Sequence, residues 1–235
     1  PPRSTLFPYT TLFRSCELTV EVNPATIDYE GFCLLKNAGV NRISLGLQSA
    51  NEDELEALGR IHSFTDFASS YNAARLAGFD NINVDIMFSL PGQSLKKFAY
   101  TLKAVTDLSP EHISCYSLII EKGTPFYDME LNLPTEDDDR QMYLFCVDFL
   151  SQRGYIQYEI SNFAKSGYEC RHNLKYWERT DYYGFGASAH SLIGNIRYEN
   201  SYDIEEYINS NKVTQTTLET ADIKNEFIML ALRKT

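Results

Sequence analysis

Three hydrogen-bonding side chains, Glu21, Gln48 and Asp85, stand near the C-terminal ends of three short segments that have the pattern of β-strands. The carboxyl ends of parallel strands open onto the face where barrel enzymes build their active sites. Two carboxylates and an amide converging there can hold a ribose, an amine or a carboxylate, and Glu21 and Asp85 also suit a general acid/base pair. The alternative is a set of buried polar groups that neighbouring loops satisfy.

Arg60 is a candidate to add a positive charge to this set. It lies in the loop Gly59-Arg60-Ile61-His62, after the short helix that follows the second strand. A guanidinium there can pair with a carboxylate in the cavity. On spacing alone, a solvated surface charge explains Arg60 equally well.

The elements that position these residues alternate between short strands and amphipathic helices. The expected strands are residues 17–22, 42–48, 81–87 and 112–120. Helices are expected from Asn23-Pro24 onward, where asparagine caps a helix and proline suits its first turn, and over 53–58, 64–77 and 94–107. Regular alternation of this kind predicts parallel βαβ units, an α/β fold.

Within the strands, apolar and polar side chains alternate. The apolar set is Leu18, Val20, Val22, Ile43, Leu45, Leu47, Ile82, Val84 and Ile86. The polar set is Thr19, Glu21, Ser44, Gly46, Gln48, Asn83 and Asp85. We expect the apolar face to meet the helices and the polar face to line a lumen. Closed eightfold barrels fill the lumen with apolar layers. A polar lumen therefore predicts an open, partial (β/α) barrel that holds a ligand.

Three parts of the chain are expected. Residues 1–15 read nearly the same from both ends and are interpreted as a non-native or disordered leader. Residues 16–131 form the partial TIM-like barrel. Residues 132–235 form a smaller α+β region, entered through a helix with an acidic start at 136–139, and truncated in its last helix.

Composition excludes several classes of protein. The 21 Lys and Arg against 32 Asp and Glu give a net charge of −11, which disfavours nonspecific nucleic-acid binding. No run approaches the roughly 18 apolar residues of a membrane span. The five cysteines show no CxxC spacing, and no secretion signal is present, so a cytoplasmic location is expected.

Six segments together resemble the radical S-adenosylmethionine family, within the group of oxygen-independent coproporphyrinogen III oxidases and related heme chaperones. They are EVNP (21–24), NRISLGLQS (41–49), LGRIH (58–62), NVDIMFSLPGQS (83–94), HNLKYW (172–177) and GFGASAHS (184–191). The resemblance spans about residues 16–235 and keeps the order of the motifs. It implies a radical SAM barrel.

The resemblance also implies roles for single residues. The family's S-adenosylmethionine-binding glutamate, glutamine, arginine and aspartate fall on Glu21, Gln48, Arg60 and Asp85, with Ile119 at a further backbone contact. Three of these positions are ones that strand alternation, an independent argument, already turns toward the lumen.

The main departure from the family is the cluster loop. Family members hold a [4Fe-4S] cluster with a CxxxCxxC loop, followed by GGGTP, and neither segment occurs here. Cys16 cannot replace three closely spaced thiolates. We therefore interpret the chain as a fragment that provides no cluster ligands and is inactive by itself.

HNLKYW resembles the chaperone group rather than the oxidases. By this resemblance His172 is a heme-iron ligand, Tyr176 lies on the same helical face and Trp177 covers the porphyrin. The alternative is a packed or capping histidine.

The implied function is binding of heme for delivery to heme-accepting proteins, with S-adenosylmethionine and a [4Fe-4S] cluster in the intact parent. The other class is an enzyme that oxidatively decarboxylates coproporphyrinogen III to protoporphyrinogen IX.

Overall fold

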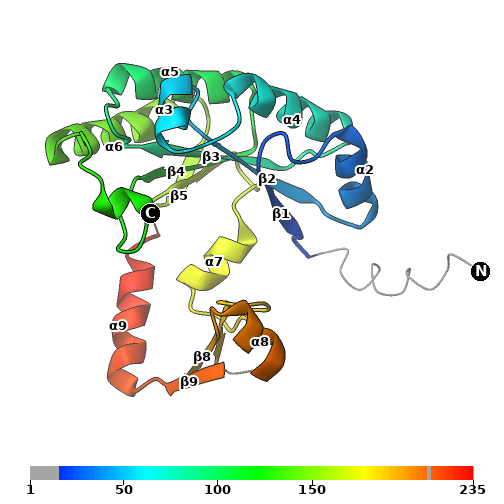
Figure 1. Ribbon diagram of the computed structural model, residues 1–235, viewed down its shortest axis with the longest axis vertical. Helices are drawn as coiled ribbons and strands as arrows, with labels where there is room; N and C mark the ends of the chain where they lie inside the picture. The colour runs from blue at the N-terminus through cyan, green and yellow to red at the C-terminus, as the bar shows by residue number, and fades with distance from the viewer. Residues whose placement is uncertain (1–15, 211–212, 235) are drawn as a thin grey trace, which may run out of the picture. The chain divides into compact units, whose positions relative to one another are not determined.

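The computed structural model describes residues 16–210 and 213–234, which belong to two compact units, Pro1–Glu169 and Cys170–Thr235. The segment 1–15 interpreted as a leader lies outside the described residues. Figure 1 shows the elements of both units.

The first unit is built on a six-stranded sheet of order β1-β2-β3-β4-β6-β5. Its strands are β1 (Thr19–Val22), β2 (Arg42–Gln48), β3 (Ile82–Phe88), β4 (His112–Ser117), β5 (Ile156–Glu159) and β6 (Asn162–Ala164). The first four are parallel, whereas β6 pairs antiparallel with β4 and β5 antiparallel with β6. The four parallel strands β1 to β4, joined by helical crossovers, confirm the predicted partial (β/α) barrel.

The helices of this unit lie against one face of the sheet (Figure 1). They are α2 (Tyr29–Asn37), α3 (Glu52–Ala57), α4 (Phe64–Leu76), α5 (Leu95–Asp107) and α6 (Glu136–Ser151), with a 3₁₀ turn at Pro125–Asp128. Capping boxes start α4 and α6, where Ser63 pairs with Asp66 and Thr135 with Asp138.

The start of the first helix differs from the expectation. The sequence pair Asn23-Pro24 forms a turn, in which the Thr26 N–H donates to the Asn23 carbonyl. Helix α2 begins at Tyr29, because Asp28 caps it by accepting a hydrogen bond from the Gly31 N–H at 2.9 Å. The prediction of a helix opening at Asn23-Pro24 was wrong.

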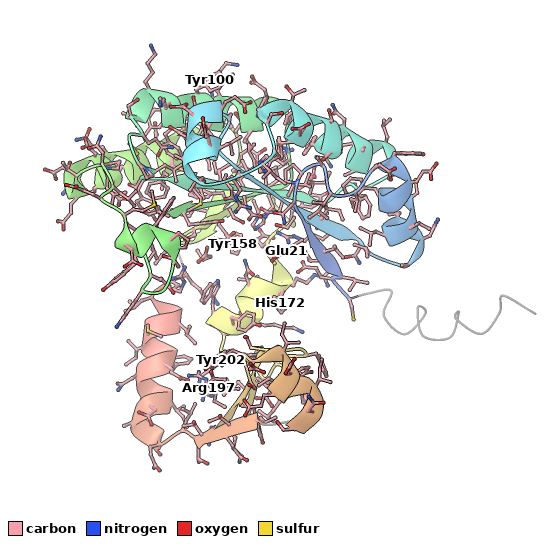
Figure 2. The ribbon with its side chains drawn as sticks, in the orientation of Figure 1. Glu21, Tyr100, Tyr158, His172, Arg197 and Tyr202 are labelled. Carbon is pink, nitrogen blue, oxygen red and sulfur yellow. The ribbon has the colours of Figure 1, made fainter. Side chains whose placement is uncertain are left out.

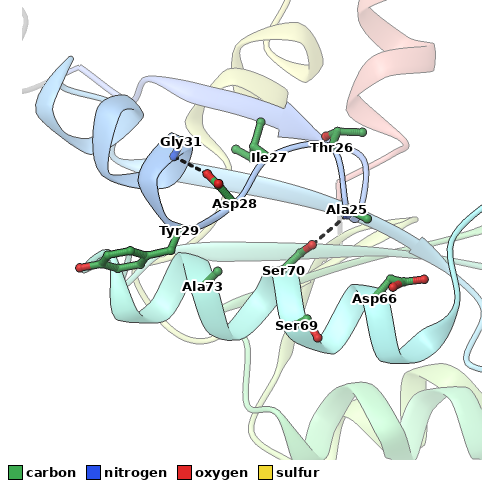
Figure 3. A pocket seen from close by; sticks show the side chains of 10 residues that line it. All are labelled: Ala25, Thr26, Ile27, Asp28, Tyr29, Gly31, Asp66, Ser69, Ser70 and Ala73. Carbon is green, nitrogen blue, oxygen red and sulfur yellow. Dashed lines mark hydrogen bonds between the residues drawn. The ribbon is translucent and has the colours of Figure 1, made fainter.

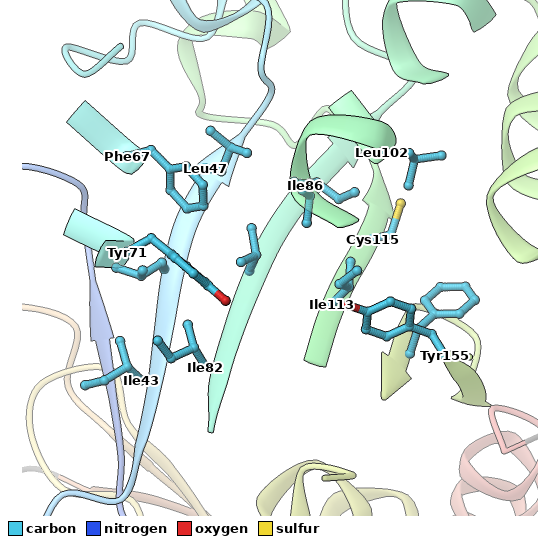
Figure 4. Close-up of a cluster of buried hydrophobic side chains, with 14 of the residues drawn as sticks. Ile43, Leu47, Phe67, Tyr71, Ile82, Ile86, Leu102, Ile113, Cys115 and Tyr155 are labelled. Carbon is cyan, nitrogen blue, oxygen red and sulfur yellow. The ribbon is translucent and has the colours of Figure 1, made fainter. Parts of the chain in front are cut away.

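The core lies between the sheet and its helices (Figure 4). The inner strands confirm the predicted alternation, since the fully buried side chains include Ile43, Leu45, Leu47, Ile82, Val84 and Ile86. Leu18 is the exception at 46 % exposure, because β1 begins one residue later.

The division between the units falls later than the boundary predicted after residue 131. Strand β6 pairs with β4 in the register His112↔Ala164, and α6 adds Met142, Cys146 and Leu150 to the core. Residues 132–169 therefore belong to the first unit.

The second unit is a small α+β structure, as expected. Its antiparallel sheet has the order β7-β8-β9. Its elements are α7 (Arg171–Trp177), β7 (His190–Ile193), β8 (Ile196–Asn200), α8 (Ile204–Ser210), β9 (Val213–Thr217) and α9 (Thr220–Ala231). None of the helices within 16–210 or 213–234 combines the length and apolarity that crossing a bilayer requires.

Candidate functional site

Four of the predicted site residues line one cavity of about 460 Å³ in the first unit: Glu21, Gln48, Arg60 and Asp85. They come from β1, β2, the turn after α3, and β3, so the parallel topology brings together positions that are far apart in sequence. The lining is completed by Val22, Asn23, Ser44, Gly46 and Tyr116.

Asp85 is held in a fixed orientation by its neighbours on the lumen face. Its Oδ2 accepts from the Ser44 hydroxyl at 2.7 Å, and its Oδ1 accepts from the Asn83 amide at 2.8 Å. Asn83 also donates to Ser44 Oγ at 2.7 Å. The carboxylate accepts in these bonds, and each oxygen keeps lone-pair capacity for a ligand in the cavity.

A chain of hydrogen-bonded polar groups extends through the lumen from Asp85 by way of Asn83 and His112 to Tyr158. Asn83 Oδ1 accepts from His112 Nδ1 at 2.5 Å, and His112 Nε2 accepts from the Tyr158 hydroxyl at 2.7 Å. Burial, and after it the positive charge of Arg42, lowers the pKa of His112 well below its ordinary value. The ring is therefore neutral, which fits one donor and one acceptor nitrogen. Figure 2 labels Tyr158 and Glu21 in this unit.

Gln48 enters the cavity from a distorted end of β2. The pairing of β2 with β3 shifts register between Gly46 and Gln48, and Gln48 has a left-handed backbone with φ 70°. A Cβ on Gly46 would lie 3.0 Å from the Gln48 amide nitrogen, so glycine leaves room for this side chain. The bulge turns a buried amide toward the ligand space.

Tyr116 fixes the carbonyl oxygen of the Gln48 side-chain amide. Its hydroxyl donates to Gln48 Oε1 at 3.2 Å. Burial, followed by the nearby charge of Asp85, raises the pKa of Tyr116 to about 12. The phenol is thus a donor at physiological pH, and the Gln48 Nε2 remains the group that can donate to a ligand.

The backbone after Gln48 rests on a buried carboxyl network. Ser49 donates to Glu54 Oε2 at 2.5 Å, and Asn51 and Gln93 donate to the same oxygen at 3.2 and 3.0 Å. Glu54 is 1 % exposed. This network ties the end of β2 to α3 and to the loop after β3, which explains how the strained residue keeps its conformation.

Glu21 and Arg60 form the more open side of the cavity. Glu21 is exposed, and Arg60 Nη1 lies 3.4 Å from Asn23 Oδ1. Ile119 follows β4 by two residues, is 76 % exposed and is absent from the lining described above. Its backbone contact stays a prediction.

A larger depression of about 650 Å³ lies between the 25–31 turn and α4 (Figure 3). Its polar groups serve the fold: Asp28 and Asp66 cap helices, and Ser70 Oγ accepts from the Ala25 N–H at 2.9 Å. None of the predicted site residues lines it, so its size carries no functional weight.

The second unit holds the three predicted heme residues on α7. His172 is exposed, and its ring meets the Tyr176 ring edge-on with centroids 4.8 Å apart. Trp177 is turned elsewhere, because five residues along an α-helix rotate the side-chain direction by about 140°. Its indole stacks with the Arg233 guanidinium at 4.3 Å. The structure thus brings His172 and Tyr176 together and turns Trp177 away from His172.

Cys115 and Cys146 contact each other, and no third cysteine joins this pair among the described residues. Cys115 and Cys146 are buried, Cys16 is exposed, and the residues that the structure describes contain no group of three His, Cys, Asp or Glu side chains placed to hold a metal ion. The side chains present therefore do not fit an iron–sulfur cluster.

Sequence reasoning missed Tyr116 and the chain of hydrogen-bonded polar groups through His112. A signal was available, because alternation along HISCYS places His112, Ser114 and Tyr116 on the same face as the polar residues of β2 and β3. Asn23, expected to cap a helix, instead contributes to the cavity lining.

Comparison with known proteins identifies the family that the chain resembles. Residues 10–105 match the Radical SAM superfamily. The chain is 44 % identical over 196 residues to the heme chaperone HemW of Bacillus subtilis, covering 82 % of this chain and 52 % of that protein. It is 35 % identical over 226 residues to HemW of Lactococcus lactis, covering 93 % and 60 %. The chain thus spans between half and two thirds of the length of these relatives.

Among solved structures, coproporphyrinogen III oxidase (HemN) from Escherichia coli, a radical SAM enzyme, superposes with a TM-score of 0.81 at 22 % identity. The match covers 100 % of this chain and 60 % of that one. At this identity the likeness shows the fold. The resemblance to the radical SAM family that the motifs indicated is confirmed.

Proposed function

We propose, with the radical SAM relationship as the premise, that this chain is the S-adenosylmethionine-binding and heme-binding part of a HemW-like heme chaperone. The observation that carries the proposal is the convergence of Glu21, Gln48, Arg60 and Asp85 on one polar cavity. Sequence identity of 44 % and 35 % to two curated heme chaperones supports the functional class. Delivery of heme to acceptor proteins is the activity proposed for the whole protein.

The donor set of the cavity fits S-adenosylmethionine. The fixed Asp85 carboxylate and the exposed Glu21 carboxylate would accept from ribose hydroxyls and the amino group. Gln48 Nε2 would donate to the ligand because Tyr116 occupies its Oε1. Arg60 would pair with the ligand carboxylate. When bound, the ligand supplies the adenosyl and methionine groups of the family's chemistry.

The cysteines of the chain do not fit an iron–sulfur cluster. What the described residues do is bind and orient. The Ser44–Asn83 pair holds Asp85, and the bulge holds Gln48, before any ligand arrives. Preorganisation of this kind lowers the ordering cost of binding.

Heme is the proposed cargo of the second unit. His172 is exposed on α7, and an imidazole nitrogen is a common axial ligand of heme iron. The Tyr176 ring packs against the imidazole and would restrict its rotation. Trp177, stacked with Arg233, is not placed to cover the same face as His172.

The enzyme alternative is oxidative decarboxylation of coproporphyrinogen III. The likeness to HemN is a likeness of fold at 22 % identity, and the HNLKYW segment favours the chaperone. No contact in the described cavity favours the oxidase.

Calorimetric titration of S-adenosylmethionine tests the first half of the proposal. Asp85→Ala and Gln48→Ala should each weaken binding by about 1–3 kcal/mol, because a buried polar partner is left unpaired. Asp66→Asn, which alters only the α4 cap, is the matched control. Equal affinity in wild type and both cavity variants would refute the binding site.

Heme titration tests the second half. Wild type should give the absorbance of histidine-ligated ferric heme, and His172→Ala should lose it. His62→Ala, which removes a buried histidine bound to the Leu47 carbonyl, is the control for adventitious ligation. Folded His172→Ala protein with the wild-type spectrum would count against the chaperone, and conversion of coproporphyrinogen III by the whole protein would favour the oxidase.

A further inference from the structure

The second unit contains a small cavity of about 270 Å³ that the function proposed above does not use. It lies among α7, the residues that follow it, β8, α9 and β7, from which Leu192 lines it. The residues that matter here are Tyr176, Trp177, Arg179, Tyr182, Arg197 and Glu226. Figure 2 labels Arg197 and His172 in this unit.

The charges lining this cavity do not balance. Glu226 pairs with two arginines at once, since its Oε2 lies 3.0 Å from Arg179 Nε and its Oε1 lies 2.8 Å from Arg197 Nη2. Both carboxylate oxygens are thereby engaged, and two guanidinium groups share one negative charge. One positive charge is left over inside a chain whose net charge is −11.

Two buried donors in the same lining lack acceptors. Trp177 Nε1 and Arg179 Nη2 have no hydrogen-bond partner within residues 16–210 and 213–234. Both groups are donors only, so a second donor cannot satisfy them. A buried unpaired donor is destabilising, and a charged acceptor would relieve both the missing bonds and the excess charge.

The remaining wall is aromatic and aliphatic. The Tyr176 and Tyr182 rings lie 4.6 Å apart, and Leu192 is 2 % exposed. An inorganic anion would leave these surfaces unused. The matching ligand is a carboxylate carried on an apolar body.

Tyr176 connects this cavity to the proposed heme ligand. Its ring contacts the His172 imidazole and also lines the cavity. We propose that the cavity binds the carboxylate of an apolar ligand, which is a propionate arm of the tetrapyrrole, with Arg179 and Trp177 as its donors. The tetrapyrrole identification rests on the proposed heme-binding function, whereas the carboxylate site does not.

The first experiment uses a small probe and a reporter already in the chain. Trp177 is the one tryptophan among the 235 residues, so its fluorescence reports on this cavity. Titration with 3-phenylpropionate should change that fluorescence saturably, whereas the uncharged 3-phenylpropionamide should not. Arg179→Gln should weaken binding about tenfold or more, because it removes a charged donor.

Arg171→Gln is the matched control, since it removes the same charge from an exposed position on α7 outside the cavity lining. Circular dichroism checks that each variant is folded. Because Arg179 also pairs with Glu226, Trp177→Phe provides a second variant that deletes only a donor, and its binding is measured by calorimetry. Equal binding of acid and amide, or no loss in either cavity variant, would overturn the carboxylate site.

The second experiment titrates hemin and hemin dimethyl ester into the full chain. The ester should bind more weakly than hemin to wild type, and the two should bind alike to Arg179→Gln. If hemin and ester bind wild type equally while phenylpropionate still binds, the propionate identification is overturned and the carboxylate site stands. A loss of the ligation spectrum in His172→Ala supports the proposed function independently, and its persistence refutes that function without affecting the carboxylate site.

Discussion

The two units place their candidate residues in opposite ways. In the first unit, Asp85 is bonded to Ser44 and Asn83 in a lumen backed by a continuous core. In the second, His172 is exposed, and the buried apolar side chains of its described residues are Cys170 and Leu192. The first site is built before a ligand arrives, whereas the second presents an exposed imidazole and two buried donors without partners, which a ligand would complete.

The largest expected effect comes from removing a core ring in the first unit. Phe98 on α5 is fully buried, so Phe98→Ala should lower the free energy of unfolding by about 3–5 kcal/mol. The matched change in the second unit, Phe227→Ala on α9 at 59 % exposure, should cost less than about 0.5 kcal/mol. Urea unfolding followed by circular dichroism, with Trp177 fluorescence for the second unit, measures both. Similar losses in the two variants would break the comparison.

Next comes the polar network. Asn83 makes bonds to Ser44, Asp85, His112 and Ser114, so Asn83→Ala should cost about 2–4 kcal/mol by leaving several buried groups unpaired. In the second unit, Asn200 donates one bond, to the Gly186 carbonyl at 2.8 Å. Asn200→Ala should therefore cost about 1 kcal/mol. Chemical denaturation of both variants checks the order, and a reversed order would contradict it.

A smaller effect depends on pH. Because the pKa of His112 is lowered in the folded state, the unfolded chain binds a proton first as pH falls below about 6.5. Stability from this group is fully present above that pH and is lost on acidification, by up to about 1.4 kcal/mol per pH unit. His112→Gln should flatten the stability profile between about pH 6.5 and 5.5. An unchanged slope would show that the buried ring does not remain neutral.

The smallest expected effect is at Tyr116. Tyr116→Phe removes one hydrogen bond to Gln48 Oε1 and should cost about 0.5–1.5 kcal/mol of stability. It should also weaken S-adenosylmethionine binding, because the Gln48 amide is then free to rotate. Tyr207→Phe, which removes an acceptor of the Gly186 N–H, is the control in the other unit and should leave that affinity unchanged. If Tyr207→Phe lost S-adenosylmethionine binding while Tyr116→Phe kept it, the binding site would belong to the second unit and the prediction would be wrong.

The same contrast between the two units explains which structural features the sequence predicts and which it does not. Alternation located the lumen residues of β1, β2 and β3. One face of that sheet packs on helices, and successive side chains along a strand point to opposite faces, so the polar positions fall together on the other face. It did not predict the bulge at Gln48, which depends on the Glu54 network from α3 and the Gln93 loop. Local capping signals misplaced the start of α2, since Asp28 competes with Asn23 for that role.

In the second unit the sequence predicted a helix carrying His172 and Tyr176, but not the direction of Trp177. That direction is set by Arg233, 56 residues away, and no periodicity encodes such a contact. The boundary near 131 was placed where composition changes, whereas antiparallel pairing of β6 with β4 extends the first unit to Glu169.

The left-handed backbone of Gln48 makes this position a point of conflict between folding and binding. A non-glycine residue at φ 70° is strained, whereas glycine is not. Gln48→Gly would relieve the backbone and delete the amide that faces the cavity. A library selected only for thermal tolerance should therefore enrich glycine at residue 48, and one selected for ligand capture should restore glutamine.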